Sequence, residues 1–222
     1  MIRAHRFVVA IVLLLICTGA LGASVVEFSP GLLNHIMKKW GGDALARLQS
    51  WGAKELEVIA SRSKSKSVLS IDELQIFNQF WNQVTYSSDQ KHWGMEDYWA
   101  TPVETLASNG ADCEDYSIAK YFSLKELGVP LESLRITYVR ALKRNEAHMV
   151  LAYYPTPDAE PYILDNLSEK LVPASERDDL EPVYSFNDED LWVTFSASFK
   201  GKSSQIRLWS ELLAKMEKER QM

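Results

Sequence analysis

Cysteine is scarce in this chain, with two among 222 residues, Cys17 and Cys113. Cys17 lies in an apolar run that follows two arginines near the N-terminus, the pattern of a cleaved export signal. Removal of that signal leaves a single thiol and excludes an internal disulfide. Exported proteins usually pair their cysteines or have none. Cys113 is therefore either a thiol with a chemical use or an inert, buried small hydrophobe.

Histidine is almost as rare, with four in the whole chain. The mature chain would keep His35, His92 and His148, so few residues can serve as a general base. Structural zinc sites generally use several Cys or His ligands, which disfavours a zinc centre built from Cys113, His148 and carboxylates.

An excess of positive charge is also missing. The formal net charge is −6, and removal of Arg3 and Arg6 with the export signal moves it to about −8. Such an acidic chain is a poor partner for nucleic acid or for anionic membrane surfaces. Seven Trp and an ordinary apolar content indicate a folded globular protein.

The export signal is predicted at residues 1–22, with small residues placing the cleavage after Gly22. Its apolar run is too short to span a bilayer comfortably, although an uncleaved N-terminal anchor is the alternative. Residues 23–222 are long enough for one domain with a sizeable core.

The N-terminal half has the pattern of helices. Residues 31–61 contain helix-forming runs punctuated by glycine, and a Ser-rich loop follows at 61–67. Ser70 and Glu73 fit a capping box that opens another helix. The apolar face of that helix is predicted from residues at helical spacing: Ile71, Leu74, Phe77, Trp81 and Val84.

A last amphipathic helix is predicted near the C-terminus, with Trp209 and Leu212 among its apolar positions. The charged tail from Met216 to Met222 is predicted to fray.

Cys113 stands at the start of a helical pattern that ends at Gly128, with Pro130 beyond it. The unpaired N–H groups and the positive dipole end of a helix N-terminus lower the pKa of a thiol. The same N–H groups can stabilise an oxyanion on an attacked carbonyl. The position of Cys113 therefore favours a nucleophile.

Three strands are predicted after this helix, at residues 134–139, 148–154 and 162–166. A hairpin centred between Thr156 and Pro157 places His148 directly opposite Asp165. Opposed residues of an antiparallel pair have Cβ atoms about 4.5–5.5 Å apart, which suits a carboxylate that orients an imidazole. A longer turn would shift this register by a residue or two.

Three segments carry a resemblance to a known family: Asp97–Pro102, Asp112–Tyr116 and Ala119–Phe122. Together they resemble the bacterial transglutaminase-like cysteine proteinases of the LapG type. His148 and Asp165 stand where that family has the rest of its triad, so the resemblance implies the catalytic set Cys113, His148 and Asp165. It covers about residues 40–172 and implies an α+β, papain-like or transglutaminase-like fold.

The resemblance also implies a biological setting. Members of the family are periplasmic, calcium-dependent endoproteases that cleave large surface adhesins near their N-terminus, at small residues such as an Ala-Ala pair, and so release the bacterium from a biofilm. An inner-membrane receptor that senses cyclic di-GMP holds them inactive. An exported protease without an obvious propeptide needs such a restraint, and an exposed Trp of the helices is a candidate docking anchor.

The acids beside the thiol, Asp112, Glu114 and Asp115, would oppose thiolate formation by like-charge repulsion. A bound cation would cancel that repulsion, and a set of oxygen ligands suits Ca²⁺. The alternative is that these acids only complement the helix dipole. With the resemblance, calcium is the expected cofactor, with Asp112 and Glu114 as its principal expected ligands and Asp115 as a third.

The remaining residues carry weaker predictions. Trp99 is expected either to form a wall of the cleft or to be a core residue. His35 and His92 are expected to be core or surface residues, and the three remaining N-terminal Trp residues are expected in the core: Trp40, Trp51 and Trp81.

Two function classes remain open from the residues alone. One is a thiol hydrolase, within which proteolysis, transglutamination and amidase action share the acyl-enzyme chemistry. The other is a calcium-dependent binding module that keeps the fold without catalysis. A complete set of Cys113, His148 and Asp165 favours the hydrolase.

Overall fold

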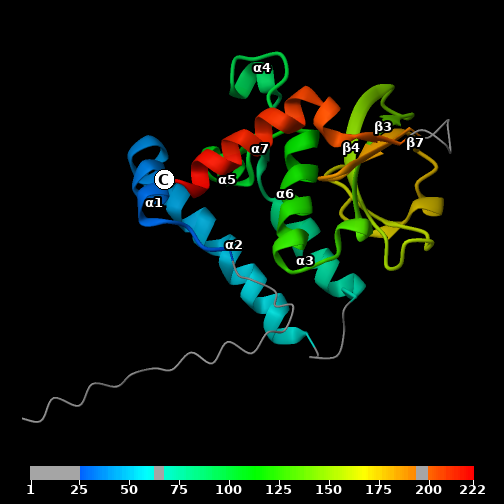
Figure 1. Cartoon of the computed structure of the whole chain (residues 1–222), viewed down its shortest axis with the longest axis horizontal. Helices are drawn as coiled ribbons and strands as arrows, with labels where there is room; N and C mark the ends of the chain where they lie inside the picture. Colours follow the sequence, from blue (N-terminus) through cyan, green and yellow to red (C-terminus); the bar gives the residue numbers. More distant parts are fainter. Residues whose placement is uncertain (1–25, 63–67, 194–199) are drawn as a thin grey trace, which may run out of the picture.

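The computed structural model describes residues 26–62, 68–193 and 200–222. The predicted export signal, including Cys17, and most of the Ser-rich loop lie outside these residues. Most of the helices form one side of the molecule and the main β-sheet forms the other, with helix α6 between them (Figure 1). Within the described ranges, no helix has the length and apolarity needed to cross a bilayer.

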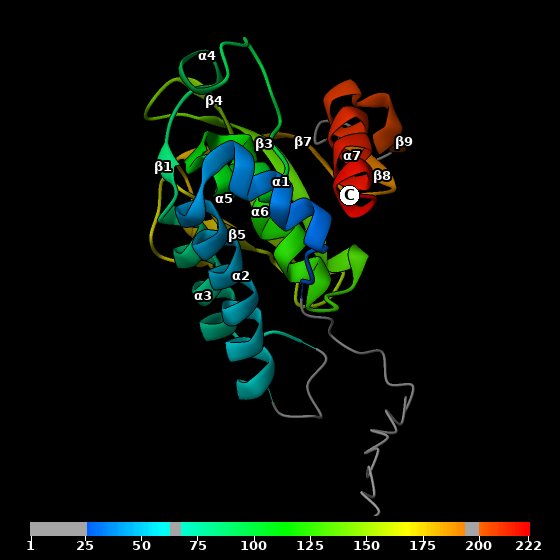
Figure 2. The same cartoon turned by 90° about the vertical axis from the view of Figure 1, so that its left-hand side faces the viewer.

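The N-terminal half is helical, as predicted. The helices have these bounds: α1 Pro30–Trp40, α2 Gly42–Ser61, α3 Ile71–Asn82, α4 Asp89–His92, α5 Pro102–Ser108, α6 Cys113–Glu126 and α7 Arg207–Arg220. Gly41, with a φ of 83°, separates α1 from α2 in a conformation that favours glycine. Figure 2 shows α1 and α2 over α5, on the side of the molecule away from the main sheet.

The predicted capping box of α3 is confirmed. The Ser70 N–H donates to Glu73 Oε2 at 2.7 Å, and the Glu73 N–H donates to Ser70 Oγ at 3.3 Å. Leu74, Phe77 and Trp81 are buried on the predicted apolar face, but Ile71 is 47% exposed. Ile71 is the first residue of the helix, so its side chain lies at the edge of the packed face.

The predicted fraying of the C-terminal tail is wrong. Helix α7 continues to Arg220, and the Glu219 carboxylate accepts a hydrogen bond from Thr101 Oγ1 at 2.6 Å. The end of α7 lies beside α1 (Figure 1), where a Cβ at Gly31 would lie 1.8 Å from the carbonyl oxygen of Met222. Tertiary contacts therefore hold a charged segment that has little helix-stabilising apolar surface of its own.

A seven-stranded antiparallel sheet forms the other side, in the order β6-β5-β4-β3-β7-β8-β9. Its strands are β3 Leu134–Ala141, β4 Glu146–Tyr153, β5 Tyr162–Leu164, β6 Val172–Pro173, β7 Leu180–Phe186, β8 Asp190–Val193 and β9 Lys200–Lys202. Two short parallel strands, β1 Thr85–Tyr86 and β2 Gly110–Ala111, lie on the helical side.

Helix α6 packs between this sheet and the other helices (Figure 1). Its buried residues join one core with those of α2, α3 and α7. The indole of Trp209 stacks on Phe122 and meets Tyr121 edge-on, which fixes α7 against α6. The N-terminus of α6 is thereby set against the middle of the sheet.

No tryptophan among the described residues is an exposed side chain, so the expected exposed docking Trp is not observed. Trp51, Trp81, Trp99 and Trp209 are buried, which confirms the core prediction for Trp51 and Trp81. Trp40 is half-buried, with Lys39 Nζ 4.0 Å from the centre of its ring.

Candidate active site

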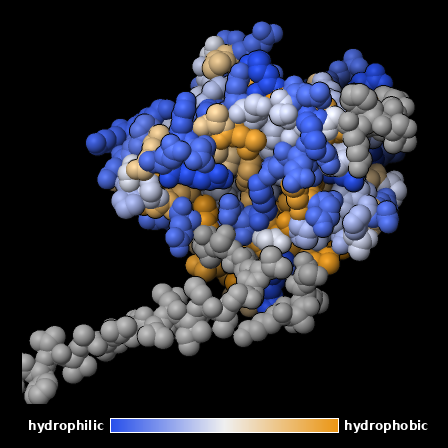
Figure 3. Space-filling model, in the orientation of Figure 1, coloured by the Kyte–Doolittle hydropathy of each residue, from blue (hydrophilic) through white to orange (hydrophobic). Residues whose placement is uncertain are grey.

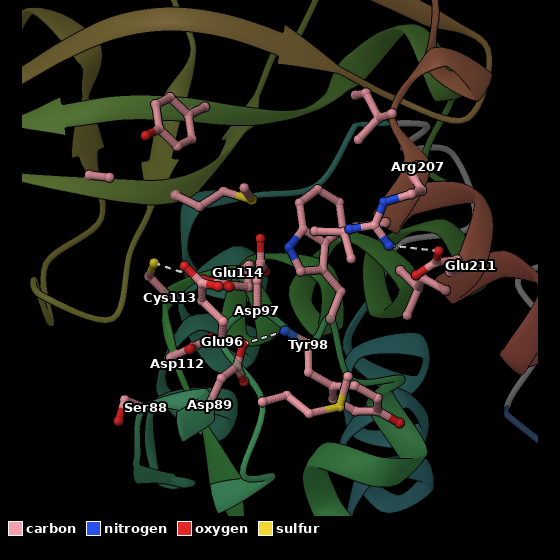
Figure 4. A pocket seen from close by; sticks show the side chains of 18 of the residues that line it. Ser88, Asp89, Glu96, Asp97, Tyr98, Asp112, Cys113, Glu114, Arg207 and Glu211 are labelled. Carbon is pink, nitrogen blue, oxygen red and sulfur yellow. Dashed lines mark hydrogen bonds and ion pairs between the residues drawn. The ribbon is translucent and has the colours of Figure 1, made fainter. Parts of the chain in front are cut away.

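A cleft of about 1010 Å³ opens at the N-terminus of α6. Its walls come from the segment between α4 and α5, from β3, β4 and β7, and from α7. Hydrophilic residues cover most of the surface in the view of Figure 3, with hydrophobic residues exposed between them. The close-up in Figure 4 shows Cys113 and Glu114 facing Asp97 within the cleft, with Arg207 and Glu211 on the other side.

Cys113 is the first residue of α6, as predicted, and its thiol lines the cleft. Sγ donates a hydrogen bond to Glu114 Oε2 at 3.0 Å. Burial and the charge of Glu114 raise the pKa of the thiol above its ordinary value, while a hydrogen bond from the backbone N–H of Met149 lowers it. Burial and the neighbouring acid therefore favour the protonated thiol, in contrast to the lowered pKa expected for a thiol at a helix start.

His148 and Asp165 are in direct contact beside the same cleft. Nε2 of His148 lies 2.7 Å from Oδ1 of Asp165, and the two residues are 3% and 1% exposed. Asp165 therefore engages Nε2, and Nδ1 is the ring nitrogen that this contact does not involve. His148 lines the cleft together with Cys113, so the structure brings the three residues predicted as a set to one place.

The predicted register of the hairpin is wrong, although the contact is present. Strand β4 pairs with β5 so that Leu151 lies opposite Leu164 and Tyr153 opposite Tyr162. The turn is longer than predicted, which shifts the pairing by two residues. Since side chains alternate with a period of two, His148 and Asp165 still lie on one face of the sheet.

Arg177 completes the surroundings of Asp165 and was not predicted. Its Nη2 donates to Asp165 Oδ2 at 2.7 Å, and Leu167 N–H donates to Oδ1 at 2.9 Å. Burial would raise the pKa of Asp165, but the hydrogen bonds from His148, Leu167 and Arg177 lower it to about 2. Asp165 is therefore a carboxylate at any working pH. No local pattern in the sequence connects Arg177 with this site.

Three carboxylates gather beside the thiol: Asp89, Asp112 and Glu114. Each offers an oxygen within 4.8 Å of the others. Asp89 was not predicted, since it comes from α4, far upstream of the Cys113 motif, and only the fold brings it here. An additional Asp in a polar connection carries no local signal of a ligand.

The electrostatics of this group fit a cation. Oδ1 of Asp89 and Oδ1 of Asp112 are buried and have no hydrogen-bond partner among the described residues. Burial and the Glu114 charge raise the pKa of Asp112 to about 10 and that of Asp89 to about 6. Carboxylate oxygens with no protein donor are the ligands that a hard divalent cation such as Ca²⁺ takes.

Asp115 lies outside this group of three. Its Oδ1 accepts the Ala100 N–H at 2.7 Å, and its Oδ2 accepts the Asp112 N–H at 3.4 Å. The Asp115 carboxylate thus joins the segment before α5 to the start of α6. It caps the helix, which corresponds to the structural alternative that the sequence left open.

Trp99 combines both roles considered for it. The side chain is buried and stacks on Phe186 with ring centres 5.8 Å apart, and it also lines the cleft. His92 packs against Gly110, where a Cβ would lie 2.3 Å from the ring, so it serves the packing of α4. His35 lies on α1, far in sequence from the cleft residues, and contacts Trp40.

A thiol at the start of a helix that packs on an antiparallel sheet, with a His–Asp pair from that sheet, defines the class of transglutaminase-like cysteine proteases. Residues 53–198 match the family model described as bacterial transglutaminase-like cysteine proteinase, and the chain belongs to this family.

Solved structures agree with this assignment. The chain is similar to LapG of Legionella pneumophila in its EGTA-treated form, with a TM-score of 0.72 and 39% identity over 87% of this chain and 100% of that one. For calcium-bound LapG of the same organism, the TM-score is 0.68 and the identity 40%, over 85% of this chain and 99% of the other. No curated protein matches the chain in sequence.

Proposed function

We propose that this chain is a calcium-dependent cysteine endoprotease in which Cys113 is the nucleophile, His148 the general base and then acid, and Asp165 the residue that orients His148. The observation that carries this proposal is the shared cleft: Cys113 and His148 line it, and Asp165 holds Nε2 of the imidazole at 2.7 Å. A nucleophile, a base and a third group that orients the base form the usual set for covalent catalysis.

In this mechanism Nδ1 of His148 accepts the thiol proton, because Nε2 is engaged by Asp165. The sulfur attacks the carbonyl carbon of the scissile peptide, and N–H groups at the start of α6 stabilise the oxyanion. His148 returns the proton to the leaving amine, which leaves a thioester on Cys113. Water, deprotonated by His148, then hydrolyses the thioester and restores the thiol.

Asp89, Asp112 and Glu114 would hold the calcium ion. When bound, the cation supplies the positive charge that offsets the carboxylates beside the thiol and so favours the thiolate. This accounts for a nucleophile placed next to three acids. The similarity to a LapG structure titled as calcium-bound supports the assignment. Asp115 has a capping role in this proposal rather than a ligand role.

The proposed substrate is an exposed linker of a large surface adhesin, cut near the adhesin's N-terminus at small residues, with biofilm dispersal as the result. The cleft volume of about 1010 Å³ lies at the upper end of the range for pockets that hold drug-sized ligands, about 300–1,000 Å³, and is large enough for a peptide segment. Similarity to LapG over most of both chains supports this substrate class.

The proposed location is the periplasm, after cleavage of residues 1–22 near Gly22, with residues 23–222 as one domain. The proposed regulator is an inner-membrane cyclic di-GMP receptor whose periplasmic part sequesters the enzyme. The basis for both is the sequence pattern of the export signal and the membership of the family.

The test is cleavage of an N-terminal adhesin fragment by the protein comprising residues 23–222. We expect cleavage in calcium buffer, loss of cleavage with EGTA, and no cleavage by Cys113→Ala, which should keep the native fold. Incorporation of an added primary amine into the fragment, in place of hydrolysis, would instead identify a transglutaminase. If wild type and Cys113→Ala bind the fragment with equal affinity and neither cleaves it, the protein is a binding module.

A further inference from the structure

Strand β3 pairs with β4 along its whole length, and α6 also contacts the β4 backbone next to His148. Strand β5 pairs with β4 only from Leu151 to Tyr153. Closer to the cleft, the backbone of Met149 is contacted by the first turns of α6 instead. Its carbonyl accepts a hydrogen bond from Ser117 Oγ at 2.9 Å.

Ser117 connects the two elements that carry the proposed catalytic pair. Its hydroxyl lies 3.0 Å from the carbonyl oxygen of Cys113, four residues earlier on α6, and 2.9 Å from the carbonyl oxygen of Met149. The side chain is 2% exposed, so water does not compete for these contacts. A serine hydroxyl has a single proton, which is shared here between the backbone of the nucleophile and that of the residue after His148.

This contact bears on the separation of thiol and imidazole. Proton transfer requires the two groups within about 2.6–3.2 Å or a bridging water, yet Cys113 and His148 belong to separate elements. The Ser117 hydroxyl bonds directly to the Met149 carbonyl of β4, and this hydroxyl takes no part in the chemistry.

We propose that Ser117 is a positioning residue, which fixes the start of α6 against β4 and thereby sets the distance between Cys113 and His148. This inference rests on the proposed function, since it concerns the geometry of the Cys–His pair. A displacement of about 1 Å can cost an enzyme up to about a hundredfold in rate, so one hydroxyl at this junction has a measurable effect.

Ser123 provides a matched control on the same helix. It is fully buried, and its Oγ accepts a hydrogen bond from Trp81 Nε1 at 2.9 Å, so it joins α6 to α3 rather than to β4. Ser117→Ala and Ser123→Ala therefore each remove one buried hydroxyl and its hydrogen bonds from α6. A purely structural role for Ser117 predicts similar effects of the two changes.

The experiment measures two quantities on residues 23–222 in calcium buffer: the rate constant for alkylation of Cys113 by iodoacetamide, and kcat and KM for the adhesin fragment. We expect Ser117→Ala to lower the alkylation rate constant and kcat by about tenfold, with KM changed less than about twofold. We expect Ser123→Ala to leave both rates within about twofold of wild type, at a comparable loss of melting temperature.

A second pair separates the hydroxyl from side-chain volume. Thr and Val have nearly the same shape, but only Thr keeps a hydroxyl. We therefore expect Cys113 to be alkylated faster in Ser117→Thr than in Ser117→Val. This comparison tests the inference even if Ser117→Ala fails to fold. Equal alkylation rates in the Thr and Val variants, or equal effects of the two Ala variants, overturn the inference. A wild-type Cys113 that reacts no faster than a free thiol, or a wild-type protein that does not cleave the fragment, contradicts the proposed function instead.

Discussion

The Cys113 thiol donates a hydrogen bond to the carboxylate of the next residue, Glu114, with Sγ 3.0 Å from Oε2. Burial and this adjacent negative charge raise the pKa of the thiol, so the contact keeps the proton on sulfur. The same Glu114 belongs to the group of three carboxylates suited to a cation. One side chain thus both restrains the thiol and offers a ligand to the ion that would release it.

Substitution of Glu114 tests this double role. In EGTA at pH 7, iodoacetamide should alkylate Cys113 faster in Glu114→Gln than in wild type. The reason is that loss of the adjacent negative charge lowers the pKa of Cys113 by about one unit or more. In calcium buffer the order should reverse, since the variant loses a ligand. Glu211→Gln, on the other side of the cleft, serves as control. Unchanged alkylation of Glu114→Gln in EGTA would show that Glu114 does not restrain the thiol.

Asp89 is the proposed ligand that the fold adds to the sequence motif. Asp89→Asn should weaken calcium binding by about tenfold or more, since affinity depends on the number of charged ligands. Isothermal titration calorimetry measures the effect. Glu96→Gln is the matched control, because Glu96 lines the cleft outside the three-carboxylate group. Equal affinities of the two variants would remove Asp89 from the site.

Arg177 should contribute to stability through Asp165. Arg177→Met leaves a buried carboxylate with one partner fewer and should lower the free energy of unfolding by about 3 kcal/mol, as for other broken buried ion pairs. Arg140→Met removes an exposed ion pair with Glu181 and should cost less than about 1 kcal/mol. Urea denaturation compares the two. Similar losses in the free energy of unfolding would show that the Arg177–Asp165 contact stabilises the fold no more than an exposed ion pair does.

Lys120 is fully buried on α6, and its Nζ has no hydrogen-bond partner among the described residues. Burial lowers its pKa from 10.5 to about 7, although Asp165 opposes this shift. The unfolded chain therefore binds more protons than the folded one between about pH 7 and 10.5, so the Lys120 contribution to stability rises with pH in that window.

Lys120→Met should remove this pH dependence and should be more stable than wild type at pH 7 by about 1 kcal/mol or more, because it removes an unpaired buried amine. Denaturant unfolding at several pH values measures both effects. Lys125→Met, on the same helix but with a half-exposed side chain paired with Asp188, controls for the loss of a charge. A wild-type stability that falls from pH 7 to 9 relative to Lys120→Met would contradict the assignment.

Local signals in the sequence predicted the features that local physics determines. The capping box of Ser70 and Glu73, the start of α6 at Cys113 and its end before Gly128 follow from side chains and backbone preferences within a few residues. The family resemblance and the α+β fold are confirmed by the family match. The contact between His148 and Asp165 was predicted correctly although the register was wrong, because a shift of two residues leaves both side chains on the same face of the hairpin.

Features that depend on chain segments far apart were missed. Asp89 and Arg177 reach the site only after α4 and the segment following β6 have folded onto it. The tail after Met216 is helical because Thr101 and α1 contact it, which no local pattern expresses. Asp115 was predicted as a third calcium ligand because it is adjacent to the thiol, and the contact of its carboxylate with the Ala100 N–H was not foreseen.

Cleavage of an N-terminal adhesin fragment, followed over time by mass spectrometry with wild type and with Cys113→Ala, Asp165→Asn and EGTA-treated protein, tests the central claim most directly. We expect the wild type to produce one internal cut in calcium buffer. Cys113→Ala and the EGTA-treated wild type should produce none. Asp165→Asn should retain partial activity, because it disturbs the orientation of His148 without removing the base. Full cleavage by folded Cys113→Ala, or a wild-type rate unaffected by EGTA, would contradict the account.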